Sequence, residues 1–181
     1  MDLNEVMGKI MVALDEVSSF NLTADMGDYE FKMYEAIDST QRELACLCSP
    51  IEKVSNLTAQ DGVLVLPDDL YELLGIYDHN YKRVGFKKIE RDKVLIDDGT
   101  YIVKFNRYPT AINNSTPLSF ELEIDKDAQE ALIYGVCALL CINDDPEAYN
   151  TYIGRYTAYI NSILSRKALR PNIVIEGGVD I

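Results

Sequence analysis

The stretch that decides the fold runs from Val94 to Arg166. It opens with VLIDDGTYIVKFNRYP (residues 94–109), two β-prone runs separated by Asp97-Asp98-Gly99-Thr100. We expect a hairpin at this turn because glycine accepts the positive φ that tight hairpins need. The apolar run DAQEALIYGVCALLCIN (residues 127–143) follows, and Asp144-Asp145-Pro146 then introduces a tyrosine-rich segment. This order predicts strands followed by two helices.

The two C-terminal helices have different patterns. Almost every residue from Ala128 to Ile142 is apolar or small, which is typical of a helix buried on all sides, and Asp125 is its expected N-cap. Asp145 and Pro146 match the cap and first position of the next helix. The expected inner stripe of that helix is Tyr149, Ile153, Tyr156, Ile160 and Ile163.

Two further helices are predicted before the strands, over residues 2–17 and 29–48. Apolar side chains recur there at three- and four-residue steps, and Gln41 interrupts the second stripe. Asp2 is a candidate cap for the first helix, and Ser49-Pro50 ends the second because a residue before proline avoids the helical conformation.

Short β-prone runs alternate with turns between these helix pairs. The expected strands are Val63–Leu66, Leu73–Tyr77, Tyr81–Phe86, Lys93–Ile96, residues 101–108 and a short extended run at Phe120–Ile124. We therefore predict an α+β, mainly α fold. It consists of a four-helix bundle (residues 1–50 and 125–168), an inserted β-rich lobe (51–124) and an extended C-terminal tail (169–181).

The tail contains a β-prone run without an obvious partner in its own chain. An unpaired strand invites pairing with another chain, so we predict strand addition to a neighbouring subunit or another protein. The candidate partner-binding residues are Ile173, Val174, Ile175, Val179 and Ile181. The alternative is a terminus that pairs with nothing.

Charge is distributed unevenly along this acidic chain of 181 residues, whose formal net charge is −13. Residues 1–80 carry 16 acidic and 4 basic side chains, whereas residues 81–110 carry 4 and 8. The basic stretch comprises Lys82, Arg83, Lys87, Lys88, Arg91 and Lys93. It predicts a subunit interface or a patch that meets DNA transiently, although lysines that guard a strand edge would give the same pattern.

The cysteines and the acidic pairs Asp68-Asp69, Asp97-Asp98 and Asp144-Asp145 are the only features that could suggest a metal site. Cys46, Cys48, Cys137 and Cys141 all lie in apolar, helix-like contexts, so we expect reduced core thiols and no metal. The acidic pairs suit turns and caps, since consecutive side chains diverge. The single histidine, His79, lies in a turn.

No catalytic or nucleotide-binding motif is present, so we expect no enzymatic activity and no cofactor. The acidic N-terminal sequence does not look like a signal peptide, and we expect a cytosolic protein.

Four motifs follow one another in a recognisable order. They are AIDSTQRELA (residues 36–45), LPDDL (66–70), an Asp-Gly turn leading to a tyrosine-rich strand that ends in Tyr-Pro (98–109), and an apolar helix joined by Asp-Asp-Pro-Glu to a last helix (128–147). This order resembles the head–tail connector (adaptor) proteins of tailed bacteriophages. The resemblance covers most of the chain and is closest over residues 94–166, whereas the basic stretch departs from it.

The resemblance implies structural work in the neck of a virion after synthesis in the host cytoplasm. Such subunits form a closed ring of about twelve copies through a heterologous interface. The ring docks on the portal protein, extends the DNA channel and meets a tail or second connector protein, while DNA passes without specific binding. The alternatives are a small acidic regulatory or DNA-mimic protein and a small metal-binding domain.

Overall fold

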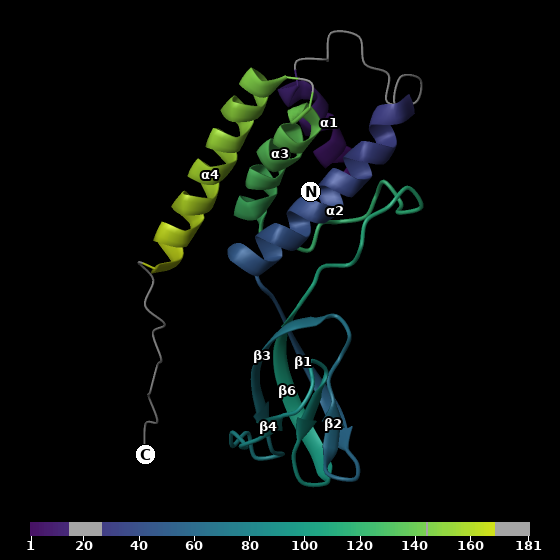
Figure 1. Cartoon of the computed structure of the whole chain (residues 1–181), viewed down its shortest axis with the longest axis vertical. Coiled ribbons are helices and arrows are strands. Elements are labelled where there is room, and N and C mark those ends of the chain that lie inside the picture. The colour runs from purple at the N-terminus through teal and green to yellow at the C-terminus, as the bar shows by residue number, and fades with distance from the viewer. Residues whose placement is uncertain (15–26, 144, 169–181) are drawn as a thin grey trace, which may run out of the picture.

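The computed structural model describes residues 1–14, 27–143 and 145–168. It has a helical part and a β lobe, which lie end to end and are joined by two chain connections (Figure 1). Each part has its own hydrophobic core.

The helical part is organised around α3 (Lys126–Cys141). The other helices are α1 (Leu3–Ala13), α2 (Gly27–Leu47) and α4 (Pro146–Ala168), and each packs mainly against α3 rather than against the other two. The closest approach is at Gly135 of α3. A Cβ added there would lie 2.7 Å from Thr40 Cγ2 and 3.0 Å from Tyr156 Cε2. The absence of a side chain at Gly135 therefore lets α2 and α4 approach α3 closely.

The β lobe contains two antiparallel three-stranded sheets. One has the order β1-β6-β3, with β1 at Ile51–Ala59, β6 at Gly99–Arg107 and β3 at Leu70–Tyr77. The other has the order β2-β5-β4, with β2 at Val63–Val65, β5 at Lys93–Leu95 and β4 at Lys87–Lys88. The two sheets share one core, whose fully buried side chains are Leu64, Ile76, Val94, Val103 and Phe105.

The predicted fold class is wrong. The described residues form four helices and two separate three-stranded sheets, not a mainly α four-helix bundle with one β-rich insertion. The apolar character of α3 explains the difference, since its buried residues extend from Ala128 to Ala138 and serve all three neighbouring helices. A helix buried in this way acts as a central support, so the other helices need not pair with one another.

The predicted hairpin at Asp97–Thr100 is also wrong. The turn exists, but it joins β5 to β6, which belong to different sheets and do not pair. The tight reversal lies instead at Asp61-Gly62, where φ is +53° and +75°, between β1 and β2. This Asp-Gly pair has the usual sequence of such a turn.

One predicted strand is absent, and Phe120–Ile124, predicted to be a short strand or an extended lead-in, forms no strand. Residues 81–86 form only an isolated bridge between Tyr77 and Arg83, and the strand lies just beyond them, at β4. In the predicted run Phe120–Ile124, the only pairing is a bridge between Asp2 and Glu121. The carbonyl of Phe120 there accepts a hydrogen bond from the N–H of Leu3 at 2.9 Å.

Two of the predicted helix caps are confirmed and one is not. Asp2 Oδ1 accepts from the N–H of Glu5 at 2.8 Å. Asp145 Oδ1 accepts from the N–H groups of Glu147 and Ala148, at 3.1 and 3.0 Å. Asp125 occupies the N-cap position of α3, but its side chain makes no capping bond and lies 3.3 Å from Lys167 Nζ instead. The Asp125 carboxylate therefore pairs with the Lys167 ammonium group instead of accepting from the first N–H groups of α3.

The return connection from the β lobe lies along the helices. Ile112, Leu122 and Ile124 belong to the helical core. Arg107, at the end of β6, forms a two-pronged ion pair with Glu123, and Glu123 Oε2 also accepts from the N–H of Thr110 at 2.6 Å. This pair fixes the point at which the chain leaves the β lobe.

Candidate functional site: the open side of the β lobe

The basic stretch lies on the β lobe, around its shortest strand. β4 consists only of Lys87 and Lys88, which pair with Leu95 and Val94 of β5. Charged residues on a short outer strand are a common defence against edge-to-edge aggregation. The lysines of β4 are exposed, and β4 is the outer strand of its sheet.

The structure divides the six basic residues into two groups. Lys93 lies 2.8 Å from Glu90, and the hydrogen bond to this carboxylate raises the pKa of Lys93. Arg83 Nη2 donates to the carbonyl of Leu74 at 3.3 Å. The side chains of the other four, Lys82, Lys87, Lys88 and Arg91, are exposed and make no ion pair within the part of the chain that the structure describes.

An apolar cavity lies next to this unpaired charge, between the two sheets. Its volume is about 380 Å³, and we call it the β3–β4 hollow. Its apolar lining consists of Leu66, Leu70, Leu73, Phe86 and Val94, and its polar lining of Tyr71, Glu72, Lys88 and Arg91. Phe86 is 37% exposed, whereas phenylalanine side chains are usually buried.

A second, more open hollow lies on the other side of Phe86. It has a volume of about 430 Å³, and its lining includes Gly62, Val84, Leu95 and Lys87. Leu95, like Phe86, is an exposed apolar residue. Exposed apolar side chains bordered by polar residues are typical of surfaces that bind another protein.

The β3–β4 hollow exists because the two sheets do not close into a barrel. β3 is the last strand of its sheet and β4 the last strand of the other. Apart from its pairing with β6, β3 is contacted over Leu74–Ile76, where Arg83 Nη2 donates to the carbonyl of Leu74 at 3.3 Å and the N–H of Val84 donates to the carbonyl of Ile76 at 2.9 Å. Over Leu70–Leu73, no described strand pairs with the outer edge of β3.

Sequence reasoning located the basic residues but missed the apolar residues that lie beside them in the fold. Leu70, Leu73 and Phe86 were not singled out, although Val84-Gly85-Phe86 interrupts the lysines with an apolar run. An apolar run inside a basic stretch was the available signal. The tail residues Ile173, Val174, Ile175, Val179 and Ile181 lie outside the described residues.

The four cysteines lie in different environments. Cys46 is exposed, Cys141 is half-buried, and Cys48 and Cys137 are buried in the helical core. Burial raises the pKa of the Cys137 thiol to about 12. Within residues 1–14, 27–143 and 145–168, no three histidine, cysteine or acidic side chains are grouped as metal ligands.

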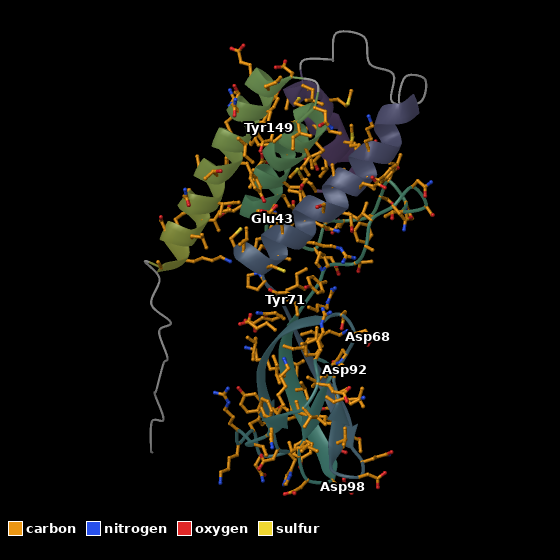
Figure 2. All side chains as sticks on the ribbon, in the orientation of Figure 1. Glu43, Asp68, Tyr71, Asp92, Asp98 and Tyr149 are labelled. Carbon is orange, nitrogen blue, oxygen red and sulfur yellow. The ribbon has the colours of Figure 1, made fainter. Side chains whose placement is uncertain are left out.

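One member of each acidic pair has a local partner among the described residues, and so does the histidine. Asp98 Oδ1 accepts from the N–H of Gly62 at 2.7 Å, and Asp69 Oδ2 lies 3.4 Å from Lys53 Nζ. His79 is exposed and its Nε2 lies 2.9 Å from Asn80 Nδ2. Figure 2 shows Asp98 at the end of the β lobe farthest from the helices, with Tyr71 at the end nearest to them.

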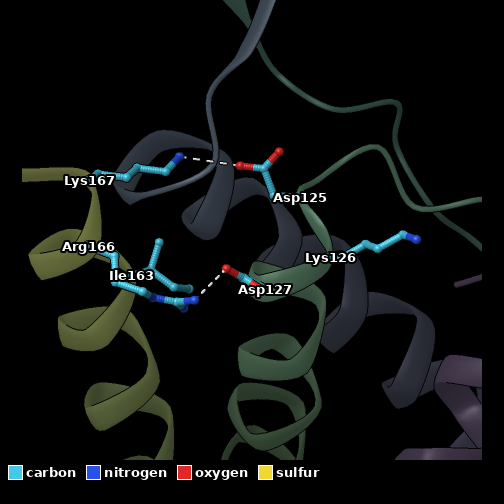
Figure 3. A pocket seen from close by; sticks show the side chains of 6 residues that line it. All are labelled: Asp125, Lys126, Asp127, Ile163, Arg166 and Lys167. Carbon is cyan, nitrogen blue, oxygen red and sulfur yellow. Dashed lines mark hydrogen bonds and ion pairs between the residues drawn. The ribbon is translucent and has the colours of Figure 1, made fainter. Parts of the chain in front are cut away.

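Another hollow, of about 290 Å³, lies where α4 ends beside the start of α3 (Figure 3). Four of its charged side chains form two ion pairs. Arg166 Nη1 lies 2.9 Å from Asp127 Oδ2, and Lys167 Nζ lies 3.3 Å from Asp125 Oδ2. Lys167 Nζ also donates to the carbonyl of Cys48 at 2.6 Å. We interpret this cluster as a fastening between helix ends rather than as a ligand site.

Comparison with known proteins identifies no family. No protein-family model matches the chain, and no curated protein matches it significantly. Among the described residues, no helix combines the length and hydrophobicity that a membrane span requires.

Proposed function

We propose that this chain is a structural, non-enzymatic subunit of an oligomeric ring in the neck of a tailed bacteriophage. The ring would dock on the portal protein, extend the DNA channel and join the head to a tail or second connector protein. DNA would pass through it without specific binding. The observation that carries the proposal is the order of the four sequence motifs, which resembles that of the connector proteins.

Each of these motifs has a definite place in the fold. Residues 36–45 lie on α2, and residues 66–70 form the turn that leads into β3. Residues 98–109 contain β6, the central strand of its sheet, and residues 128–147 contain most of α3 and the start of α4. The motifs therefore lie at connections and central elements of the fold.

A closed ring also needs two different surfaces that fit each other, because each subunit uses one face on each neighbour. The β lobe offers exposed Phe86 and Leu95 beside unpaired lysines. The helical part offers exposed carboxylates on α2, at Glu35 and Glu43, and an exposed Leu47. Opposite charge beside apolar area supports a contact between the β lobe of one copy and α2 of the next.

Native mass spectrometry and negative-stain electron microscopy of the purified protein, alone and mixed with portal, test this proposal. We expect closed rings of about twelve copies, formed by the protein alone or on the portal. A monomer in both conditions contradicts the proposal.

A charge reversal tests the suggested contact between neighbours. The double variant Lys82→Glu/Lys87→Glu should weaken ring formation, and raising the salt concentration should weaken it in the unsubstituted protein as well. Lys126→Glu is the matched control, because Lys126 is an exposed lysine on α3, outside the β lobe. Equal assembly of the double variant and the unsubstituted protein would place the interface elsewhere.

The acidity of the chain favours a second function, that of a regulatory protein that mimics DNA. Its formal net charge of −13 could attract the basic cleft of a DNA-binding protein. Displacement of DNA from DNA-binding proteins by a chain that forms no ring would support this alternative.

A further inference from the structure

The outer edge of β1 has no strand beside it. β1 is an end strand of the sheet order β1-β6-β3, so only one of its edges pairs with β6. Among the residues that the structure describes, no strand pairs with the other edge between Ile51 and Ala59. The strand has nine residues and no proline, and Val54 near its middle is 60% exposed. A long, exposed edge of this kind is a template on which another strand can pair.

The charges of β1 do not guard this edge. Glu52 Oε2 lies 2.6 Å from Lys104 Nζ, and Lys53 Nζ lies 3.4 Å from Asp69 Oδ2, so each charge of β1 is balanced within its own chain. The other end strands differ. β4 consists of two exposed lysines, and β3 is contacted by Val84. β1 is therefore the edge of the β lobe that is most open to a further strand.

The apolar residues of β1 fit a second β1 in one antiparallel register. A two-fold axis at Val54 places this exposed valine opposite Val54 of the second copy. Ile51 then lies opposite Leu57, and each of these two side chains is only partly buried against the core of its own chain. Apolar side chains directly opposite each other on neighbouring strands stabilise a sheet.

The charged residues of β1 fit the same register. Glu52 lies opposite Asn56 of the second copy, and Lys53 opposite Ser55, so no like charges face each other. Moving the axis to Lys53 or to Glu52 would oppose two lysines or two glutamates, which is destabilising. Moving it the other way, to Ser55, separates the two exposed valines. The register centred on Val54 is therefore favoured by both charge and apolar contact.

We propose that β1 of a second copy of this chain adds antiparallel to the outer edge of β1, with Val54 on the two-fold axis. The two three-stranded sheets then form one continuous sheet across the pair. A two-fold contact points two copies in opposite directions, whereas the copies of a ring all point the same way. The β1 pair is therefore separate from the ring contact and does not rest on the proposed function.

Disulfide formation tests the register. Val54→Cys, in the background Cys46→Ser/Cys141→Ser, should form a covalent dimer on mild oxidation, because opposite residues of antiparallel strands lie about 4.5–5.5 Å apart. Asn56→Cys is the matched control, since Asn56 is also exposed on β1 but would lie roughly 14 Å along the strands from its own copy. We expect Val54→Cys to cross-link at least about tenfold faster. Equal rates for the two variants overturn the proposal.

Charge reversal on the axis tests the contact without a cysteine. Val54→Lys and Val54→Glu each oppose two like charges, so each variant alone should dimerise at least about fivefold more weakly than the unsubstituted chain. A mixture of the two should form the mixed dimer. Asn56→Lys is the control, because it faces Glu52 of the second copy and should keep the dimer. Sedimentation equilibrium measures all four, and circular dichroism checks that each is folded. A mixture that stays monomeric overturns the proposal.

Salt distinguishes this contact from the ring contact. The β1 pair brings together two acidic molecules through a surface whose charges are balanced, so screening should strengthen it. The ring contact between opposite charges should weaken under the same conditions. If the unsubstituted chain, without portal, forms no dimer at about 100 µM and about 1 M salt, the β1 pair is overturned. Loss of rings with dimers retained counts against the ring alone.

Discussion

Asp38 of α2 accepts a hydrogen bond from the backbone N–H of Ile112 at 2.8 Å, 74 residues later in the sequence. One turn further along α2, Gln41 Nε2 donates to the carbonyl of Thr110 at 2.9 Å. Arg42 Nε lies 3.0 Å from Asp38 Oδ2 and holds that carboxylate in place. The polar residues of the motif at 36–45 therefore fasten the chain as it returns from the β lobe to the helices.

Loss of the Gln41 amide should destabilise the protein. Gln41 is fully buried, so Gln41→Leu would leave the carbonyl of Thr110 without its donor. We expect the free energy of unfolding in urea to fall by about 1–3 kcal/mol. Glu35→Leu, at an exposed position of the same helix, is the control and should have little effect. Equal stability of Gln41→Leu and the unsubstituted protein would show that this hydrogen bond is dispensable.

Replacement of two helical glycines by alanine should change the free energy of unfolding in opposite directions. Gly135→Ala places a methyl group 2.7 Å from Thr40 Cγ2 and should lower the free energy of unfolding by about 1–3 kcal/mol. Gly154 of α4 has no atom within 4 Å of the same methyl position. Gly154→Ala should therefore stabilise the protein, by about 0.5–1 kcal/mol, because alanine favours the helix. Thermal unfolding of both variants checks this pair, and a stabilised Gly135→Ala would contradict the close packing around α3.

Stability should depend on pH through Glu123. Burial alone would raise the pKa of this carboxyl, but hydrogen bonds from Arg107 and from the N–H of Thr110 outweigh it and lower the pKa below its ordinary value of 4.5. A carboxyl whose pKa is lower in the folded than in the unfolded chain contributes its full stabilisation of the fold at pH values above its pKa in the unfolded chain. This contribution disappears as the pH falls through the lowered, folded pKa.

The variant Glu123→Gln should isolate that contribution. We expect its free energy of unfolding at neutral pH to be about 1–3 kcal/mol lower than that of the unsubstituted protein. On acidification, the free energy of unfolding of the variant should fall by less than that of the unsubstituted protein. Urea titrations between neutral pH and pH about 3 measure both effects. Glu121→Gln serves as the control, because Glu121 is exposed. Parallel pH curves for Glu123→Gln and the unsubstituted chain would count against the ion pair.

The cysteines should differ strongly in reactivity. Cys46 is exposed, whereas Cys137 is buried and has a pKa of about 12. Because the thiolate is the reactive form, a thiol reagent should modify Cys46 first and Cys137 only on unfolding. Mass spectrometry of peptides after timed labelling measures both rates. Similar rates at the two sites would contradict the burial of Cys137, and slow labelling of Cys46 that a chelator reverses would revive the metal-binding alternative.

Local sequence signals predicted the helices better than the sheets. The caps at Asp2 and Asp145 depend on residues two or three positions away, so the sequence alone revealed them. The pairing of β6 with β1 depends on contacts between residues about 40 to 56 positions apart, as at Ala59–Gly99 and Ile51–Arg107. Turn chemistry at Asp97–Thr100 could not show that β5 and β6 enter different sheets. The same limit hid the β3–β4 hollow, whose apolar residues come from Leu66, from β3 and β5, and from Phe86.

The register of β1 and β6 has a consequence for how this architecture can change in evolution. Ile51 and Arg107 are paired, so the chain enters and leaves the β lobe at neighbouring positions. Such paired residues lie about 4.5–5.5 Å apart, a gap that a short turn can bridge. The whole lobe is therefore an exchangeable module. A lobe of different sequence could therefore be joined to the helices at these two neighbouring positions.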